Sequence, residues 1–171
     1  PTLRIADLEG ISKICKRKKI LMAVDNTFTT PLAIKPFQLG ADFVIHSITK
    51  LLAGHSDVTL GYVAAKRKKY AEAIYNFVVS TGLTPSPFDC WLAERGLATF
   101  SLRFEKSQKT AFSLAKFLST HNKVLRTLYP KLLDHPDKTR ASKILGKNGC
   151  NMVSFAIEGG RKEANKFVSN I

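Results

Sequence analysis

The sequence predicts an α/β fold in which short apolar strands alternate with amphipathic helices. Short continuous apolar runs recur along the chain, and most of them are followed by a segment with helical spacing of apolar residues. The hydrophobic fraction is 44% of 171 residues, which is enough to fill the core of a domain and excludes a disordered chain. No apolar run approaches the ~18 to 20 residues needed to cross a bilayer. The first residues also lack the layout of a secretory signal.

The first predicted elements are a helix and a buried strand. Apolar residues recur at helical spacing from Leu8 to Cys15, with Asp7 as the expected N-cap. The basic run at residues 16–19 then lies at the helix C-terminus, where positive charge suits the helix dipole. Residues 20–24 form a short continuous apolar run that predicts a buried strand.

The remaining elements continue the alternation, which predicts a parallel sheet. We expect a short helical turn within residues 31–40 and an irregular crossing or hinge at residues 80–88, which contain Gly82, Pro85 and Pro87. Further strands are predicted at residues 42–46, 58–65, 124–129 and 151–157. Further helices are predicted at residues 66–79, 89–96, 107–120, 137–146 and in the last ten residues.

Charge and cysteine content narrow the class of partner and the compartment. The net charge is +14, which attracts phosphate groups of any kind. The basic runs at residues 16–19 and 66–69 fall at helix ends, where solvated charge is the usual explanation, so we expect neither a nucleic-acid nor a membrane partner. Cys15, Cys90 and Cys150 match neither a zinc cluster nor a disulfide framework, which predicts no metal site and a cytoplasmic location.

Side chains that could bind a ligand or react with one lie directly after two predicted strands. Asp25 ends one strand and Ser47 ends the next, so in a parallel sheet both lie at the carboxyl edge, where open α/β sheets bind ligands. Thr49 and Lys50 follow directly, and two hydroxyls with one amine suit a phosphate-bearing aldehyde. The small, polar loop at residues 53–57 lets the backbone approach a ligand closely.

Several further motifs occur in a fixed order over essentially the whole chain. They are residues 24–28, 39–42, 46–50, 54–57, 86–91, 94–97, 102–104 and 151–155. Together they resemble the signature of the Cys/Met-metabolism (transsulfuration) family of pyridoxal-phosphate (PLP) enzymes, which includes cystathionine γ-synthase and cystathionine γ-lyase. Chains of this family are roughly twice as long or more, so the resemblance is to their central portion. Cys150 departs from the glycine-rich run that the family shows at this point.

The resemblance implies a role for each site residue. Lys50 matches the lysine that forms the internal aldimine and later removes the α-proton of the substrate. Asp25 matches the aspartate that pairs with the pyridine nitrogen of the cofactor and keeps it protonated. Ser47 and Thr49 match the hydroxyls that bind the cofactor phosphate. Catalysis is thus expected from Lys50, and cofactor binding from Asp25, Ser47, Thr49 and Lys50, with no metal.

The histidine, tryptophan and cysteine residues that could suggest other chemistry are interpreted as structural. His46 and His55 flank the expected ligand loop, where a histidine is more often a structural donor than a catalyst. Trp91 is expected in the core. Cys90 and Cys150 are expected to pack as small apolar residues, since neither has a nearby partner that would make it a nucleophile.

The resemblance also implies an architecture and an activity. The fold is expected to be aspartate aminotransferase-like (fold type I), with residues 1–100 as the latter part of the PLP-binding domain and 101–171 as the beginning of a C-terminal α/β domain. The parent protein is expected to be a cystathionine γ-synthase or γ-lyase that works as a tetramer of paired dimers. Methionine γ-lyase and O-acetyl- or O-succinylhomoserine sulfhydrylase remain alternatives, because no residue here decides between them.

An inactive truncated remnant is the alternative of another class. The family's phosphate loop, its ring-stacking tyrosine, and the tyrosine and arginine lent by a neighbouring subunit would precede Pro1. The arginine that binds the substrate carboxylate would follow Ile171. We therefore expect the 171-residue chain alone to be inactive.

Overall fold

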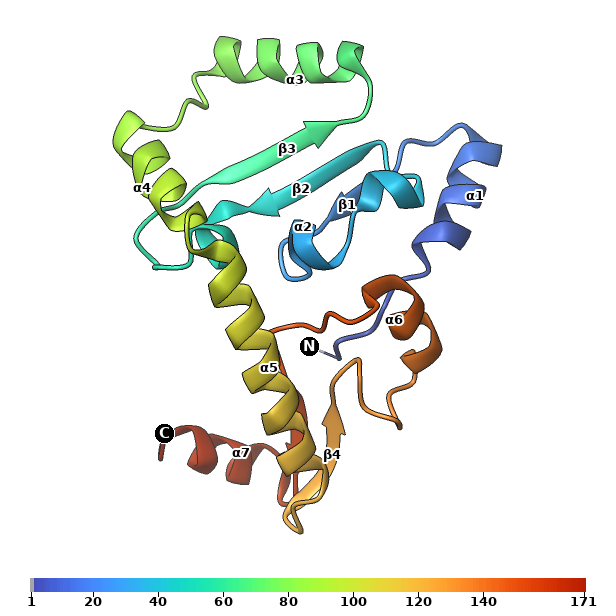
Figure 1. Ribbon diagram of the computed structural model, residues 1–171, viewed down its shortest axis with the longest axis vertical. Coiled ribbons are helices and arrows are strands. Elements are labelled where there is room, and N and C mark those ends of the chain that lie inside the picture. The colour runs from blue at the N-terminus through green and yellow to red at the C-terminus, as the bar shows by residue number, and fades with distance from the viewer. Residues whose placement is uncertain (1) are drawn as a thin grey trace. The chain divides into compact units, whose positions relative to one another are not determined.

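The computed structural model describes residues 2–171 and confirms the α/β class (Figure 1). The chain divides into two compact units. One unit comprises residues 6–105, and the other comprises residues 106–171 together with the N-terminal segment that ends at Ile5. No helix of the described residues is both long enough and apolar enough to span a membrane.

The unit of residues 6–105 is built on a three-stranded sheet. Strand β2 (Phe43–Ser47) lies between β1 (Ala23–Asp25) and β3 (Gly61–Ala65), as Figure 1 shows. β1 pairs with β2 in parallel, with Asp25 opposite Ile45. β3 pairs with β2 antiparallel, with Gly61 opposite Ser47. The prediction of a parallel sheet is therefore wrong for β3, because residues 48–60 turn back directly instead of crossing over through a helix.

Helices surround this sheet at nearly the predicted positions. Helix α1 begins as expected, since the Asp7 carboxylate accepts a hydrogen bond from the Gly10 amide at 3.1 Å. The predicted turn between the first two strands consists of two short helices. The helical elements of this unit are α1 (Leu8–Lys18), α2 (Thr30–Ala33), the 3₁₀ helix η1 (Pro36–Leu39), the π-helical turn η2 (Ile48–Leu52), α3 (Lys68–Thr81), α4 (Pro87–Leu97) and the start of α5 (Phe100–Ser119).

Two expectations about buried segments are wrong. The first strand starts only at Ala23, because the Ile20 amide donates to the Cys15 carbonyl at 2.9 Å and completes the end of α1. Ile20 is 59% exposed. Trp91 is not in the core either: it is 54% exposed and stacks on the equally accessible Phe88, with ring centroids 5.9 Å apart.

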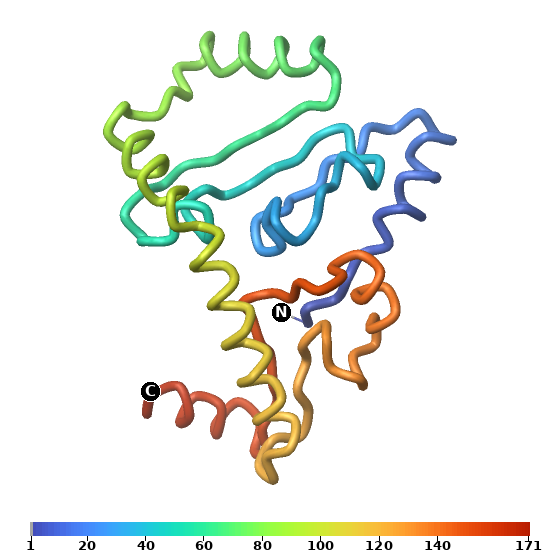
Figure 2. Tube along the Cα trace, viewed as in Figure 1, coloured from blue at the N-terminus to red at the C-terminus, as the bar shows by residue number. Residues whose placement is uncertain are grey.

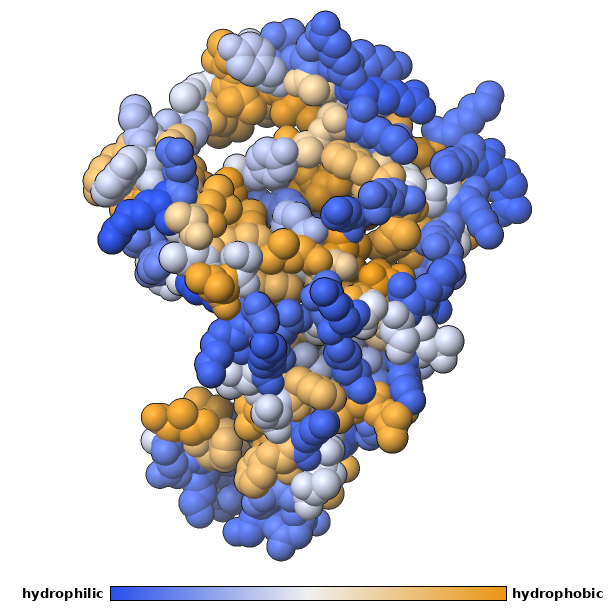
Figure 3. Space-filling model, viewed as in Figure 1, coloured by the Kyte–Doolittle hydropathy of each residue, from blue (hydrophilic) through white to orange (hydrophobic). Residues whose placement is uncertain are grey.

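Apolar side chains also remain exposed on the sheet. Figure 3 shows a hydrophobic area over β2 and β3. Ile45 and Val63 are paired on one face of the sheet and Tyr62 lies on the other, and they are 36%, 46% and 50% exposed. Cys90 is exposed too, contrary to the expectation that it packs as a small apolar residue, whereas Cys150 is buried as expected. These side chains keep contact with solvent because none of the described elements covers them.

The second unit packs α5 against an antiparallel pair of strands. Strand β4 (Val124–Leu128) pairs with β5 (Ser154–Ile157), and helices α6 (Lys138–Leu145) and α7 (Gly160–Val168) follow the strands as predicted. Tyr129 is fully buried at the centre, and its hydroxyl donates to the Cys150 carbonyl at 3.1 Å. The buried core consists of Ala111, Ala115, Tyr129, Leu132 and Cys150.

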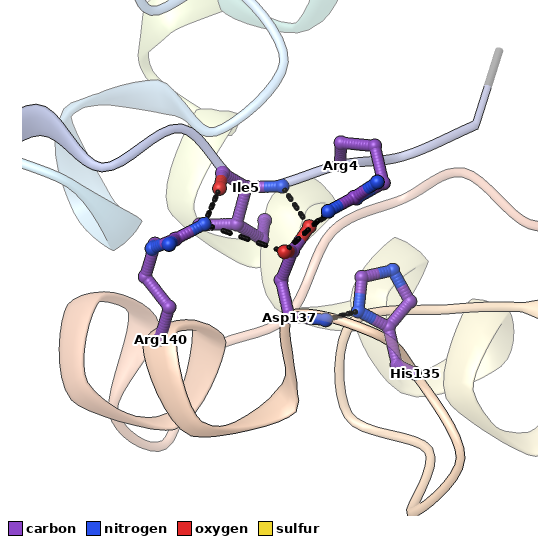
Figure 4. Close-up of polar contacts among 5 residues, drawn as sticks. All are labelled: Arg4, Ile5, His135, Asp137 and Arg140. Atoms are coloured by element: carbon purple, nitrogen blue, oxygen red, sulfur yellow. Dashed lines mark hydrogen bonds and ion pairs between the residues drawn. The ribbon is translucent and has the colours of Figure 1, made fainter.

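A network of charged groups fixes the N-terminal segment within this unit (Figure 4). The Arg4 guanidinium donates two hydrogen bonds to the Asp137 carboxylate, at 2.6 and 2.8 Å, and the Ile5 amide donates a third at 2.9 Å. Arg140 donates to the Ile5 carbonyl at 2.7 Å and to Asp137 at 3.3 Å. The hydrogen bonds from Arg4 and Ile5 hold the pKa of Asp137 well below its usual range.

Candidate active site

The predicted site begins where β1 and β2 end side by side. Asp25 is the last residue of β1, and its Oδ1 accepts a hydrogen bond from the Thr27 amide at 2.9 Å. The Thr27 hydroxyl in turn accepts from the Ser47 amide, at 2.8 Å, at the end of β2. Thr27 is buried. One threonine therefore connects the carboxylate end of β1 to the hydroxyl-bearing end of β2, and the expectation that Asp25 and Ser47 are neighbours is confirmed.

Lys50 lies in the turn that leaves β2, which Figure 2 shows as the bend joining β2 to β3. The turn is η2, but Lys50 itself has non-helical backbone angles of φ −82° and ψ −117°. The Thr49 hydroxyl accepts from the Leu60 amide at 3.0 Å and donates to the Leu60 carbonyl at 3.3 Å. Thr49 thereby fixes the two ends of the turn to each other.

The groups that this arrangement leaves available are an amine, a hydroxyl and a carboxylate. Lys50 is exposed, and within residues 2–171 its amine has no hydrogen bond or ion pair. The Ser47 hydroxyl is half-buried and likewise has no partner among the described residues. Asp25 is exposed and keeps Oδ2 available beyond the bond from Thr27. An amine can condense with an aldehyde, a hydroxyl can donate to a phosphate, and a carboxylate can hold a protonated ring nitrogen.

His46 lies beside this site but is buried within the sheet. It is 4% exposed, and its Nδ1 has no hydrogen-bond partner among the described residues. Burial lowers the pKa of His46, and the nearby charge of Asp25 partly opposes that shift. The lowered pKa favours the neutral form of the His46 ring.

The loop after Lys50 is held by backbone contacts. Nδ1 of His55 lies 2.7 Å from the Ala53 carbonyl, which fits the structural role expected for this histidine.

Across the described part of the chain, no group of histidine, cysteine or carboxylate side chains could hold a metal ion.

Thr27 and Arg103 both lie in motifs that the sequence singled out, at residues 24–28 and 102–104, but sequence reasoning gave neither of them a role at the site. Thr27 could have been found, because an aspartate two residues before a backbone amide commonly forms such a local turn. Arg103 lies more than fifty residues from Lys50 in the sequence, yet its guanidinium donates to the carbonyls of Leu51 and Leu52. No local pattern signals a contact of this range.

Fold and site together define an α/β protein with an exposed lysine after one strand and a carboxylate at the end of the neighbouring parallel strand. The chain belongs to the family described as Cys/Met metabolism PLP-dependent enzyme, whose model matches residues 1–171. The cofactor of this family is pyridoxal 5'-phosphate. An amine, a hydroxyl and a carboxylate are the types of group that could bind its aldehyde, its phosphate and its ring nitrogen, and Lys50, Ser47 and Asp25 offer them.

Similar proteins are enzymes of cystathionine and methionine metabolism by name. Cystathionine gamma-lyase of Dictyostelium discoideum is 38% identical over 171 residues, which are 100% of this chain and 44% of that protein. Cystathionine beta-lyase MetC of Bacillus subtilis is 39% identical over 172 residues, which are 100% of this chain and 43% of that protein. The chain thus spans about half the length, or less, of the curated relatives it matches.

Solved structures agree with the fold. The crystal structure of cystathionine gamma synthase from Xanthomonas oryzae pv. oryzae, in complex with cystathionine, matches with a TM-score of 0.94 at 39% identity. That match covers 98% of this chain and 43% of the solved chain. CalE6, a methionine gamma lyase from Micromonospora echinospora, matches with a TM-score of 0.90 at 32% identity over 95% of this chain and 44% of the solved chain. These structures confirm the expected PLP-dependent fold for the span they cover.

Proposed function

We propose that the chain is the central part of a PLP-dependent transsulfuration enzyme of the cystathionine γ-synthase or γ-lyase type. Its substrate would be a sulfur amino acid or an activated homoserine ester, on which it replaces or eliminates the γ-substituent. The observation that carries the proposal is the amine of Lys50, which has no hydrogen bond or ion pair within residues 2–171 and lies in the turn that leaves β2, in a chain that belongs to a PLP-dependent family. When bound, pyridoxal phosphate supplies an electron-accepting ring that stabilises negative charge at the substrate α-carbon.

The residues of this chain would then have distinct tasks. The Lys50 amine would hold the cofactor at its aldehyde, and once released by the substrate's amino group Lys50 would take the substrate α-proton and pass protons towards the γ-position. The Asp25 carboxylate keeps the ring nitrogen protonated. Ser47 donates to the phosphate, and Thr49 can do so by exchanging its donor bond to the Leu60 carbonyl.

The proposal also covers the domain organisation, the oligomeric state and the cellular location of the protein. We assign residues 1–100 to the latter part of a PLP-binding domain and 101–171 to the beginning of a C-terminal domain, and the complete parent protein to a tetramer of paired dimers. The relatives' greater length supports the reading of both parts as incomplete domains. The free thiols of Cys15, Cys90 and Cys150 support a cytoplasmic location. Light scattering after size exclusion tests the assembly, and a mass other than that of four subunits contradicts it.

The decisive test is covalent capture of the cofactor. The complete parent protein is incubated with pyridoxal phosphate, reduced with borohydride and digested for peptide mapping. We expect the pyridoxyl group on Lys50, its loss in Lys50→Ala, and its retention in the control Lys35→Ala, which removes an exposed amine elsewhere in the same unit. A pyridoxyl group found on another lysine, with none on Lys50, contradicts the assignment.

Two further outcomes separate the classes of function. Asp25→Ala should retain capture at Lys50 but lose turnover, because the ring nitrogen is no longer held protonated. Methionine γ-lyase remains a second candidate, since CalE6 carries that name and shares the fold. Release of a thiol from methionine but not from cystathionine would favour it. Capture at Lys50 by the complete parent protein without turnover of either substrate, or of an activated homoserine ester, would favour an inactive remnant.

A further inference from the structure

The guanidinium of one arginine binds the backbone carbonyls that immediately follow Lys50. Arg103, in the first turn of α5, donates from Nη1 to the Leu51 carbonyl at 2.9 Å and from Nη2 to the Leu52 carbonyl at 3.0 Å. The same Nη2 donates to the Gly96 carbonyl near the end of α4 at 2.7 Å. Nε donates to the Thr99 hydroxyl at 3.0 Å, which orients the side chain. Arg103 is half-buried in this position.

These hydrogen bonds provide donors for carbonyl groups that the turn itself leaves unpaired. Within η2 the Ala53 amide donates to Ile48 and the Gly54 amide donates to Lys50, at 2.9 and 2.8 Å. The next two carbonyls, at Leu51 and Leu52, lie at the end of the turn, where no further amide of the turn reaches them. Arg103 satisfies both. The bond from Gly54 holds the Lys50 carbonyl, but the non-helical angles of Lys50 interrupt the helix, so the carbonyls of Leu51 and Leu52 depend on the external donor.

Close packing marks the same contact. A side chain at Gly96 would collide with the backbone of Ala53, and one at Gly54 would collide with the Arg103 guanidinium. Gly54 has φ +75°, a conformation that favours glycine in any case. Both glycines therefore allow α4, the turn and Arg103 to meet without an intervening side chain.

We propose that Arg103 is a positioning residue for Lys50. It anchors the turn that carries the reactive amine to the end of α4, without touching substrate or cofactor. This inference rests on the proposed function, in which Lys50 must meet an aldehyde in a fixed geometry. Arginine suits the task because its rigid fork can bind three carbonyls at once, whereas lysine offers one flexible ammonium.

The first test needs no cofactor. Amide hydrogen exchange is measured on the protein and on Arg103→Ala, Arg103→Lys and the control Arg95→Ala, which removes an exposed arginine of α4 that lies over Trp91. We expect exchange at Ala53 and Gly54 to rise about tenfold or more in Arg103→Ala and less in Arg103→Lys. Exchange in β1 to β3 should stay unchanged in all variants. A rise spread evenly over residues 6–105, or no rise at residues 53 and 54, overturns the proposal.

The second test measures the rate of borohydride-dependent capture of pyridoxal phosphate at Lys50. We expect Arg103→Ala to slow capture by about tenfold to a hundredfold and millimolar methylguanidinium to restore part of the loss. Unchanged capture in Arg103→Ala refutes the positioning role. If Arg103→Ala does not fold, Arg103→Lys decides: capture at the rate of the unsubstituted protein refutes the role. Absence of capture at Lys50 in the unsubstituted protein instead refutes the proposed function, and the exchange test of the anchor still stands.

Discussion

Replacing Gly96 by alanine tests how closely α4 approaches the turn of Lys50. In the interior of a helix this change normally stabilises by about 1 kcal/mol, because glycine has the poorer helix propensity. Here the added Cβ would lie 2.9 Å from Ala53 Cα and 3.0 Å from Ala53 C, and closer still to the Ala53 carbonyl oxygen. All three atoms are backbone, and ordinary contact begins at 3.4 Å. The two segments must therefore separate by about 0.5 to 1 Å.

This separation has a thermodynamic and a functional consequence. Overpacking typically costs about 1 to 3 kcal/mol, so the gain in helix propensity should be cancelled or exceeded. A displacement approaching 1 Å of a reactive group can reduce a rate by about 100-fold, and Gly96 also offers its carbonyl to Arg103. We therefore expect Gly96→Ala to be no more stable than the unsubstituted protein and to capture pyridoxal phosphate at Lys50 between tenfold and 100-fold more slowly.

The assay combines chemical denaturation with the borohydride capture rate. Glu94→Ala is the matched control, because position 94 lies on the same helix, is exposed, and gains a good helix former without meeting the turn. The control should leave both measurements nearly unchanged. If Gly96→Ala were stabilised by about 1 kcal/mol with normal capture, α4 and the turn could not be in the close contact on which the argument rests.

Two further predictions concern the second unit. The pKa of Asp137 is lowered in the folded protein, so its carboxylate stabilises the fold above about pH 4, and this stabilisation is lost as the pH falls towards the lowered pKa. In denaturant titrations Asp137→Asn should therefore unfold more easily at neutral pH. It should also lose less stability on acidification than the unsubstituted protein does. A variant as acid-sensitive as the unsubstituted protein would contradict this. Burial raises the pKa of Tyr129 to about 12, so the folded protein keeps a proton that the unfolded chain releases near pH 10, and stability should fall as the pH rises from about 10 to 12. Tyr129→Phe should remove the part of the phenolate absorbance that appears at the highest pH. It should also lose about 1 to 2 kcal/mol of stability, because the Cys150 carbonyl is left unpaired. Tyr75→Phe, at a 68% exposed position, is the control and should show neither effect.

The order of helices and strands was accessible from the sequence because it depends on local patterns. Asp7 at the start of α1 and the abrupt change from apolar to polar residues at Asp25 are signals that a short stretch of chain carries by itself. Strand direction is not such a signal. An apolar run reads the same in either direction, so the antiparallel pairing of β3 depended on whether residues 48–60 formed a crossover helix.

Burial was harder to predict than element type. Aromatic residues at helical spacing indicate a covered face, which is why Trp91 was expected in the core. The pattern does not say which element provides the cover, and Trp91 instead stacks on Phe88 on the accessible side of α4. Cys90 is exposed on the same helix for the same reason.

The candidate site shows why sequence motifs identify reactive groups better than the groups that hold them. Lys50 and Ser47 are recognisable by type and spacing, but their geometry depends on side chains that bind backbone atoms: Thr27 on the Ser47 amide, Thr49 on both polar groups of Leu60, and Arg103 on two carbonyls. Each of these contacts stabilises a turn that has little regular hydrogen bonding of its own. Because they act on one short segment, their contributions should be coupled, so that loss of one weakens the effect of the others. An amine without a partner is then presented on a fixed backbone, which is the arrangement that lowers the entropic barrier to condensation with an aldehyde.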